Sequence, residues 1–142
     1  MSYEINSIHL YADGACSGNP GPAGVGVLMR YKDKERRISK FLGDATNNIA
    51  ELMAVKVGLE SVKNRSVPVI IYTDSQYTIG VLGKWKAKKN IDLVKEIKNL
   101  ISSFTQVSFV WVRGHSGNIE NEIVDKLAVS AYTEKRDFEM KN

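Results

Sequence analysis

The hydrophobic pattern of this chain changes once, after Leu42, and the change limits the folds that the chain can adopt. Before it, apolar and polar residues alternate from Ile8 to Ala12, which predicts a strand. Residues 24–31 and 36–42 have strand-like patterns too, and a short polar turn joins them. Because strands joined by so short a connection are antiparallel, the first part of the chain predicts an antiparallel sheet.

After Leu42, helix and strand patterns alternate. Helices are expected at four places, each with a capping residue or apolar residues at helical spacing: residues 47–63, 75–83, 92–104 and 119–133. Strands are expected over two β-rich apolar runs: residues 67–73 and 107–113. Strands followed by alternating helices and strands predict an α/β fold, in which helices cover a mixed sheet.

Length and composition are those of one globular domain. The 142 residues, 43% hydrophobic and 25% charged, exclude disordered, collagen-like and disulfide-rich chains. No apolar run could span a bilayer, and the residues after Met1 do not have the pattern of a signal peptide. The lone Cys16 has no disulfide partner within the chain, which fits a reducing compartment. We therefore expect a cytoplasmic protein that is not bound to a membrane.

The expected domain is residues 1–142, with an ordered core over about residues 5–133 and a frayed polar tail over residues 134–142. With 20 Lys and Arg against 16 Asp and Glu, the formal net charge is +4. So mild a basic excess makes a nucleic-acid partner plausible but does not prove one.

Glu51 is the first of four acidic residues that ordinary structural roles explain poorly when they are considered together. Successive residues of a helix turn by about 100°, which places Ala54 and Gly58 within about 60° of Glu51. Lys56 and Glu60 lie on the opposite, charged side. Glu51 therefore projects from the apolar side of its helix, although a solvated glutamate at the helix edge is the common alternative.

The other three acidic residues are Asp13, Asp74 and Asp125. Asp13 ends the first strand before a Gly-rich loop, and Asp74 ends an apolar strand, where ligands of open α/β sheets gather. Asp125 shares a helix face with Ala128 and Val129. Taken alone, these residues could be a turn aspartate, a helix N-cap and a surface charge.

Together the four carboxylates favour a metal site. Partly buried carboxylates repel one another unless cations neutralise them. An oxygen-only ligand set favours Mg²⁺ or Mn²⁺ over zinc, and two such ions about 4 Å apart can promote phosphodiester hydrolysis. His115, in the loop after the 107–113 strand, could transfer protons there, although an exposed loop histidine is the ordinary interpretation.

Competing motifs do not fit. Gly18, Gly21, Gly24 and Gly26 follow a strand, but a second strand comes next, whereas a dinucleotide-binding fingerprint requires a helix. Residues 80–85 lack the spacing of a phosphate-binding loop. Cys16 has no accompanying His and Asp pattern that would make it a nucleophile.

The chain resembles type 1 ribonuclease H in four motifs, which occur in the family's order between Ile8 and Ala131. They are YADGACSGNPG at residues 11–21, TNNIAEL at 46–52, TDSQY at 73–77, and WVRGHSG at 111–117 followed by EN at 120–121 and DKLA at 125–128. The resemblance implies a mixed five-stranded sheet whose first three strands are antiparallel. It also implies endonucleolytic hydrolysis of the RNA strand of RNA–DNA hybrids, leaving 5′-phosphate and 3′-hydroxyl ends.

The resemblance assigns roles to individual residues. Asp13, Glu51, Asp74 and Asp125 match the carboxylates that hold two Mg²⁺ ions, with Mn²⁺ as a possible substitute, and His115 matches a histidine that assists turnover. Contacts to the RNA 2′-hydroxyl and minor groove are implied for a set of small and amide residues: Gly14, Cys16, Asn19, Asn47, Asn48 and Gln76. Contacts to DNA phosphate and sugar are implied for Thr46, Asn19, Asn90 and Trp85, although Trp85 could instead be a core tryptophan.

One departure concerns substrate affinity. Well-known bacterial members carry a long basic protrusion, which here shrinks to the short connection between Trp85 and Asn90. Four lysines form a remaining cationic cluster, which could equally be a solvated turn: Lys84, Lys86, Lys88 and Lys89. Fewer phosphate contacts lower the affinity and its salt dependence.

The expected partner is the hybrid duplex, bound by a monomer without an obligate protein partner. Two alternatives stay open: a module that binds hybrids without cleaving them, and a nuclease domain derived from a reverse transcriptase.

Overall fold

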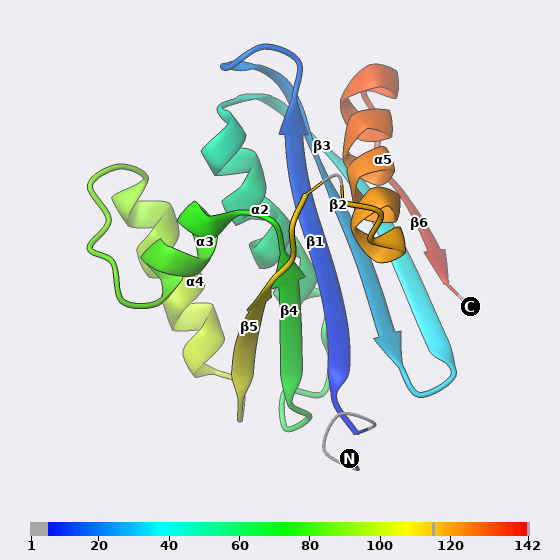
Figure 1. Ribbon diagram of the computed structural model, residues 1–142, viewed down its shortest axis with the longest axis vertical. Coiled ribbons are helices and arrows are strands. Elements are labelled where there is room, and N and C mark those ends of the chain that lie inside the picture. Colours follow the sequence, from blue (N-terminus) through cyan, green and yellow to red (C-terminus); the bar gives the residue numbers. More distant parts are fainter. Residues whose placement is uncertain (1–5, 115, 142) are drawn as a thin grey trace.

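The computed structural model describes residues 6–114 and 116–141, which form one mixed sheet and its covering helices (Figure 1). The strands are β1 (Ile8–Cys16), β2 (Gly21–Tyr31), β3 (Lys34–Ala45), β4 (Val69–Thr73), β5 (Val107–Trp111) and β6 (Phe138–Lys141). The helices are α2 (Asn47–Glu60), α3 (Gln76–Leu82), α4 (Ile91–Ser102) and α5 (Ile119–Glu134). No helix of the described residues is long and apolar enough to cross a membrane.

The sheet has the strand order β5-β4-β1-β2-β3-β6. The first three strands pair antiparallel, as expected, while β1 pairs with β4, and β4 with β5, in parallel. A parallel pair requires a crossover connection, which α2 supplies between β3 and β4, and α3 and α4 supply between β4 and β5. The predicted mixed α/β fold is therefore confirmed.

The main core lies between the sheet and α2. Leu10 on β1 and Val27 on β2 share a face of the sheet and are fully buried, as are Leu52, Val55 and Leu59 of α2. Helix α5 packs on β1, β2 and β3 from the other face, as Figure 1 shows.

Two glycines let α5 approach β2 closely. A Cβ atom at Gly26 would lie 2.0 Å from the carbonyl oxygen of Val124, and one at Gly24 would lie 2.3 Å from that of Ala128. No side chain fits at either position. These glycines, which did not match a dinucleotide fingerprint, serve strand–helix packing.

The expectation of a frayed tail is wrong. Residues 138–141 form a sixth strand, β6, which pairs antiparallel with β3 (Ile38 opposite Glu139). The Arg36 guanidinium donates to the Glu139 carboxylate across this pair, with an Nε–Oε2 distance of 2.9 Å. The segment alternates apolar and polar residues (Phe138, Glu139, Met140, Lys141), but four residues are too few for this pattern to predict a strand. Its pairing depends on backbone hydrogen bonds to a distant segment.

Candidate active site

Three of the predicted carboxylates meet at one end of the sheet. Asp13 lies inside β1, and not at the end of the strand as predicted, because β1 continues to Cys16. Glu51 lies in the first turns of α2, and Asp74 directly after β4. Because β1 and β4 are parallel with Tyr11 beside Tyr72, the aspartates two residues further on reach the same level. One oxygen from each of the three side chains lies within 4.8 Å of the others.

Glu51 is aimed into the site by its helix and by a backbone contact. It is only 8% exposed, which agrees with its predicted position on the apolar side of α2. The Gly14 N–H donates a hydrogen bond to Glu51 Oε1 over 2.8 Å. A Cβ atom at Gly14 would lie 2.2 Å from the carbonyl carbon of Ala50, so only glycine permits this approach of β1 and α2.

Burial and mutual repulsion favour the protonated forms of two of these groups. Burial, and then the charges of Glu51 and Asp74, raise the pKa of Asp13 far above its ordinary value. Burial, and then the Asp74 charge, raise the pKa of Glu51, although the Gly14 hydrogen bond opposes that shift. A divalent cation would reverse this preference, because it binds ionised carboxylates.

The donor set fits a hard cation. The cluster supplies carboxylate oxygens, the ligands that Mg²⁺ and Mn²⁺ prefer, and includes neither His nor Cys among the described residues. Uncompensated, three carboxylates this close would destabilise the fold. The arrangement therefore fits a divalent metal site held by Asp13, Glu51 and Asp74.

Asp125 lies near this cluster but is not one of its three members. It is half-buried on α5, and its charge is among those that raise the pKa of Asp13. It is absent from the group of described carboxylates whose oxygens lie within 4.8 Å. Its role as a metal ligand stays a prediction.

His115 lies outside the described residues, so its predicted role is untested. The residue before it, Gly114, is close to the cluster, because a Cβ atom there would lie 2.7 Å from Asp74 Oδ2. The motif that contains His115 therefore reaches the acidic cluster at Gly114.

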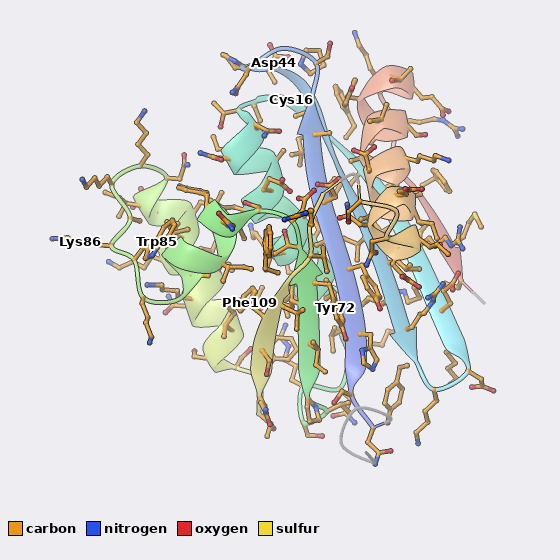
Figure 2. The ribbon with its side chains drawn as sticks, viewed as in Figure 1. Cys16, Asp44, Tyr72, Trp85, Lys86 and Phe109 are labelled. Carbon is orange, nitrogen blue, oxygen red and sulfur yellow. The ribbon has the colours of Figure 1, made fainter. Side chains whose placement is uncertain are left out.

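Several predicted RNA contacts surround the junction of β1 and α2. The Asn47 N–H donates to Asn19 Oδ1 over 3.0 Å, and the Thr46 hydroxyl caps α2 by accepting from the Ile49 N–H. Cys16 lies at the upper end of β1 in Figure 2 and donates its thiol to the Gly18 carbonyl. Asn48 and Gln76 are exposed, so their amides are open to a ligand.

One of the predicted DNA contacts, Trp85, lines a hollow between α3 and the lysine-rich loop, together with Asn48 from the predicted RNA contacts. The hollow encloses about 410 Å³ and is lined by Asn48, Tyr77, Val81, Trp85, Lys86, Lys88 and Lys89. Trp85 is 55% exposed, so the alternative of a core tryptophan is wrong. Asn90 donates its side-chain N–H to the Tyr77 hydroxyl over 3.1 Å, and Figure 2 shows Trp85 and Lys86 at this edge of the molecule.

Sequence reasoning did not assign a role to Tyr77, Gly80 or Trp111. The Tyr77 hydroxyl accepts the hydrogen bond from Asn90. Gly80 leaves room for the indole ring of Trp85, because a Cβ atom at Gly80 would lie 2.2 Å from that ring. Trp111 donates its indole N–H to the carbonyl oxygen of Asp74 over 3.2 Å. Tyr77 and Trp111 belong to the family motifs and Gly80 follows one of them, but the periodicity of the sequence does not show which residues they contact.

The acidic cluster lies beside exposed amides and lysines. A site of this kind indicates a class of protein: enzymes that act on nucleic acids. The RNase H family model matches residues 5–133, and the chain belongs to the RNase H family. A curated ribonuclease H from Trichodesmium erythraeum is 45% identical, with 92% of each chain covered.

Solved structures agree. The chain is similar to RNase H1 of the archaeon Halobacterium salinarum, with a TM-score of 0.77, 28% identity, and 90% of this chain and 98% of that chain covered. It is also similar to LC11-RNase H1 solved in complex with an RNA/DNA hybrid, with a TM-score of 0.77, 25% identity, and 91% and 99% covered.

Proposed function

We propose that this chain is an endoribonuclease that hydrolyses the RNA strand of RNA–DNA hybrids with two divalent metal ions, Mg²⁺ or Mn²⁺ in its place. The observation that carries the proposal is the cluster of Asp13, Glu51 and Asp74, within 4.8 Å, in a member of the RNase H family. When bound, the ions would supply an activated water and stabilise the attacking and leaving oxygens.

The chain's own residues prepare this chemistry. Asp13 is buried beside Glu51 and Asp74, and it would contribute to holding both ions, as the resemblance implies. Glu51 and Asp74 complete one ligand set, and Asp125 of α5 contributes to the other. His115 serves proton transfer during turnover, and the products carry 5′-phosphate and 3′-hydroxyl ends.

Selectivity for the hybrid rests on the two surfaces beside the cluster. Amides can donate to and accept from a 2′-hydroxyl, so Asn19, Asn48 and Gln76 suit the RNA strand, together with Gly14 and Cys16. Asn47 faces the DNA side of the minor groove. Contacts to sugar and phosphate position the duplex without reading its bases, so we expect little sequence preference.

The DNA strand would lie over the hollow beside α3. Trp85 offers an exposed ring to DNA sugars. Thr46, Asn19 and Asn90 would offer polar groups to a DNA phosphate, as the resemblance implies. Lys84, Lys86, Lys88 and Lys89 are all exposed and would contact backbone phosphates. We expect the protein to act as a monomer in the cytoplasm.

The direct test is cleavage of an end-labelled RNA–DNA hybrid by purified protein with Mg²⁺. We expect internal cleavage of the RNA strand, with no activity in EDTA and none on single-stranded RNA. Equal cleavage of single-stranded RNA, or hybrid binding without any metal-dependent cleavage, would refute the proposal; the second result would identify a binding module.

Asp13→Asn tests the site itself. It should lower cleavage by about a thousandfold or more, because a bound metal supplies several kcal/mol of transition-state stabilisation. Hybrid binding should persist. Asp33→Asn, in the exposed turn between β2 and β3, is the matched control and should cleave normally.

A further inference from the structure

Asp74 differs from the other two carboxylates of the cluster in how its backbone is held. Asp13 lies inside β1, which is paired on both sides, and Glu51 lies inside α2. Asp74 lies in the two-residue link between β4 and α3, outside both elements. The position of its carboxylate therefore depends on what contacts this link.

Part of that support is local. The Ser75 N–H donates to the Thr73 hydroxyl over 3.1 Å, and the Ser75 side chain caps α3 by accepting from the Thr78 N–H. These contacts fix the residues on either side of Asp74. Neither of them reaches the backbone carbonyl or the carboxylate of Asp74 itself.

The last residue of β5 reaches the backbone of Asp74. Trp111 pairs with Thr73 in parallel register, and its indole Nε1–H donates to the Asp74 carbonyl oxygen over 3.2 Å. Trp111 is 46% exposed, so its ring contributes little to the core. The contact that it does make holds the residue that carries the carboxylate.

Three residues further on, the chain passes the carboxylate itself. A Cβ atom at Gly114 would lie 2.7 Å from Asp74 Oδ2 and 3.5 Å from its carboxyl carbon. The nearest obstacle is thus the end of a side chain and not backbone. Adding a methyl group here would displace the carboxylate at little cost to folding.

We infer that Trp111 and Gly114 are positioning residues for Asp74: the indole holds its carbonyl, and the bare backbone of Gly114 leaves the space that its carboxylate occupies. The inference rests on the proposed metal-dependent function, because it concerns Asp74 as a metal ligand. The position of the Asp74 carboxylate therefore depends on the end of β5 and on the loop that follows it.

Trp111→Phe removes the indole donor and keeps an aromatic ring, and Gly114→Ala displaces the carboxylate. We expect each to weaken Mn²⁺ binding to the hybrid-free protein by about three- to tenfold, as loss of one hydrogen bond or a small ligand shift would. Isothermal titration calorimetry measures this without any catalysis. Cleavage should need correspondingly more Mg²⁺ for half-maximal rate, while kcat recovers at saturating Mg²⁺.

The matched control is Val110→Ala, an exposed change on the same strand. It should leave the Mn²⁺ affinity and the Mg²⁺ midpoint unchanged. A purely structural role would lower the thermal midpoint of unfolding without moving either metal measurement. That result, or unchanged metal affinity in both test variants, would overturn the inference.

The two hypotheses can fail separately. If the wild type binds Mn²⁺ but does not cleave hybrids, the proposed function fails while the Mn²⁺ titrations still decide this inference. If the wild type does not bind Mn²⁺ at all, both are overturned.

Discussion

The backbone N–H of Gly14 donates to Glu51 Oε1 over 2.8 Å, and this contact ties the end of β1 to the start of α2. It also holds the Glu51 carboxylate beside Asp13, where both are buried. Without a metal, the fold therefore keeps acidic groups together that would separate on unfolding.

The stability of the metal-free protein should fall as pH rises from about 5 to 8. The folded-state pKa of Asp13 and of Glu51 is raised, to about 8 for Glu51, whereas unfolded carboxyls titrate near 4. Between these values the folded state binds protons that the unfolded state has released, so the free energy of unfolding decreases with pH. Urea denaturation in EDTA across this range measures the slope.

Mg²⁺ should flatten that slope, because it stabilises the ionised carboxylates in the folded state. Asp13→Asn should flatten it in EDTA and raise the neutral-pH stability by on the order of 1–3 kcal/mol. Asp13, with its raised pKa, must take up a proton when the chain folds at neutral pH, whereas an amide does not. A pH-independent stability of the wild type in EDTA would contradict this account.

Gly26→Ala should destabilise the protein by roughly 2–3 kcal/mol, since the added methyl would overlap the Val124 carbonyl of α5. Helix α5 carries Asp125, so cleavage should fall as well. The urea midpoint and the hybrid cleavage rate measure the two effects. Thr133→Ala, exposed on the same helix, should change neither.

Removing residues 138–142 should lower stability by on the order of 1–2 kcal/mol and leave cleavage intact. The deletion eliminates β6, with its backbone pairing to β3 and the Arg36–Glu139 ion pair. Strand β6 lies at the edge of the sheet far from β4 and Asp74. Thermal unfolding and the cleavage assay are the measurements, and loss of cleavage at a temperature where the variant is folded would contradict the prediction.

Glu139→Gln separates the two contributions of β6. It removes the ion pair and keeps the strand, so it should cost no more than about 1 kcal/mol, as partly exposed pairs do. The remaining loss in the deletion would then come from strand pairing.

Replacing Lys86 and Lys88 by Ala should weaken hybrid binding and reduce its salt dependence. The slope of log K against log salt should fall by about one for each lysine that contacts a phosphate. Lys95 and Lys98, exposed on α4, are matched controls of equal charge. The lysine variants are combined with Asp13→Asn, so that the hybrid is bound but not cleaved. Fluorescence anisotropy over a salt series then measures affinity alone. Equal effects of the two pairs would show that only net charge matters.

The sequence alone determined the order of the helices and of every strand except β6, and it determined the buried side of α2. The alternation along β1 and the helical spacing around Glu51 indicate which face of each element is buried. They do so because the apolar residues of one element recur with the period of that element. The sequence also indicated correctly that Asp74 follows the end of a strand, whereas the prediction that Asp13 ends the first strand is wrong, because β1 continues to Cys16. The family motifs supplied the remaining site residues, whose roles stay predictions.

Tertiary structure alone decided which distant segments touch. It paired residues 138–141 with β3, left Trp85 exposed, kept Asp125 outside the three-carboxylate cluster, and brought Trp111 to the Asp74 carbonyl. These contacts depend on backbone hydrogen bonds and on the close approach of elements far apart in the chain. Periodicity within a segment shows which of its faces is buried, but it does not identify the distant segment that the face contacts.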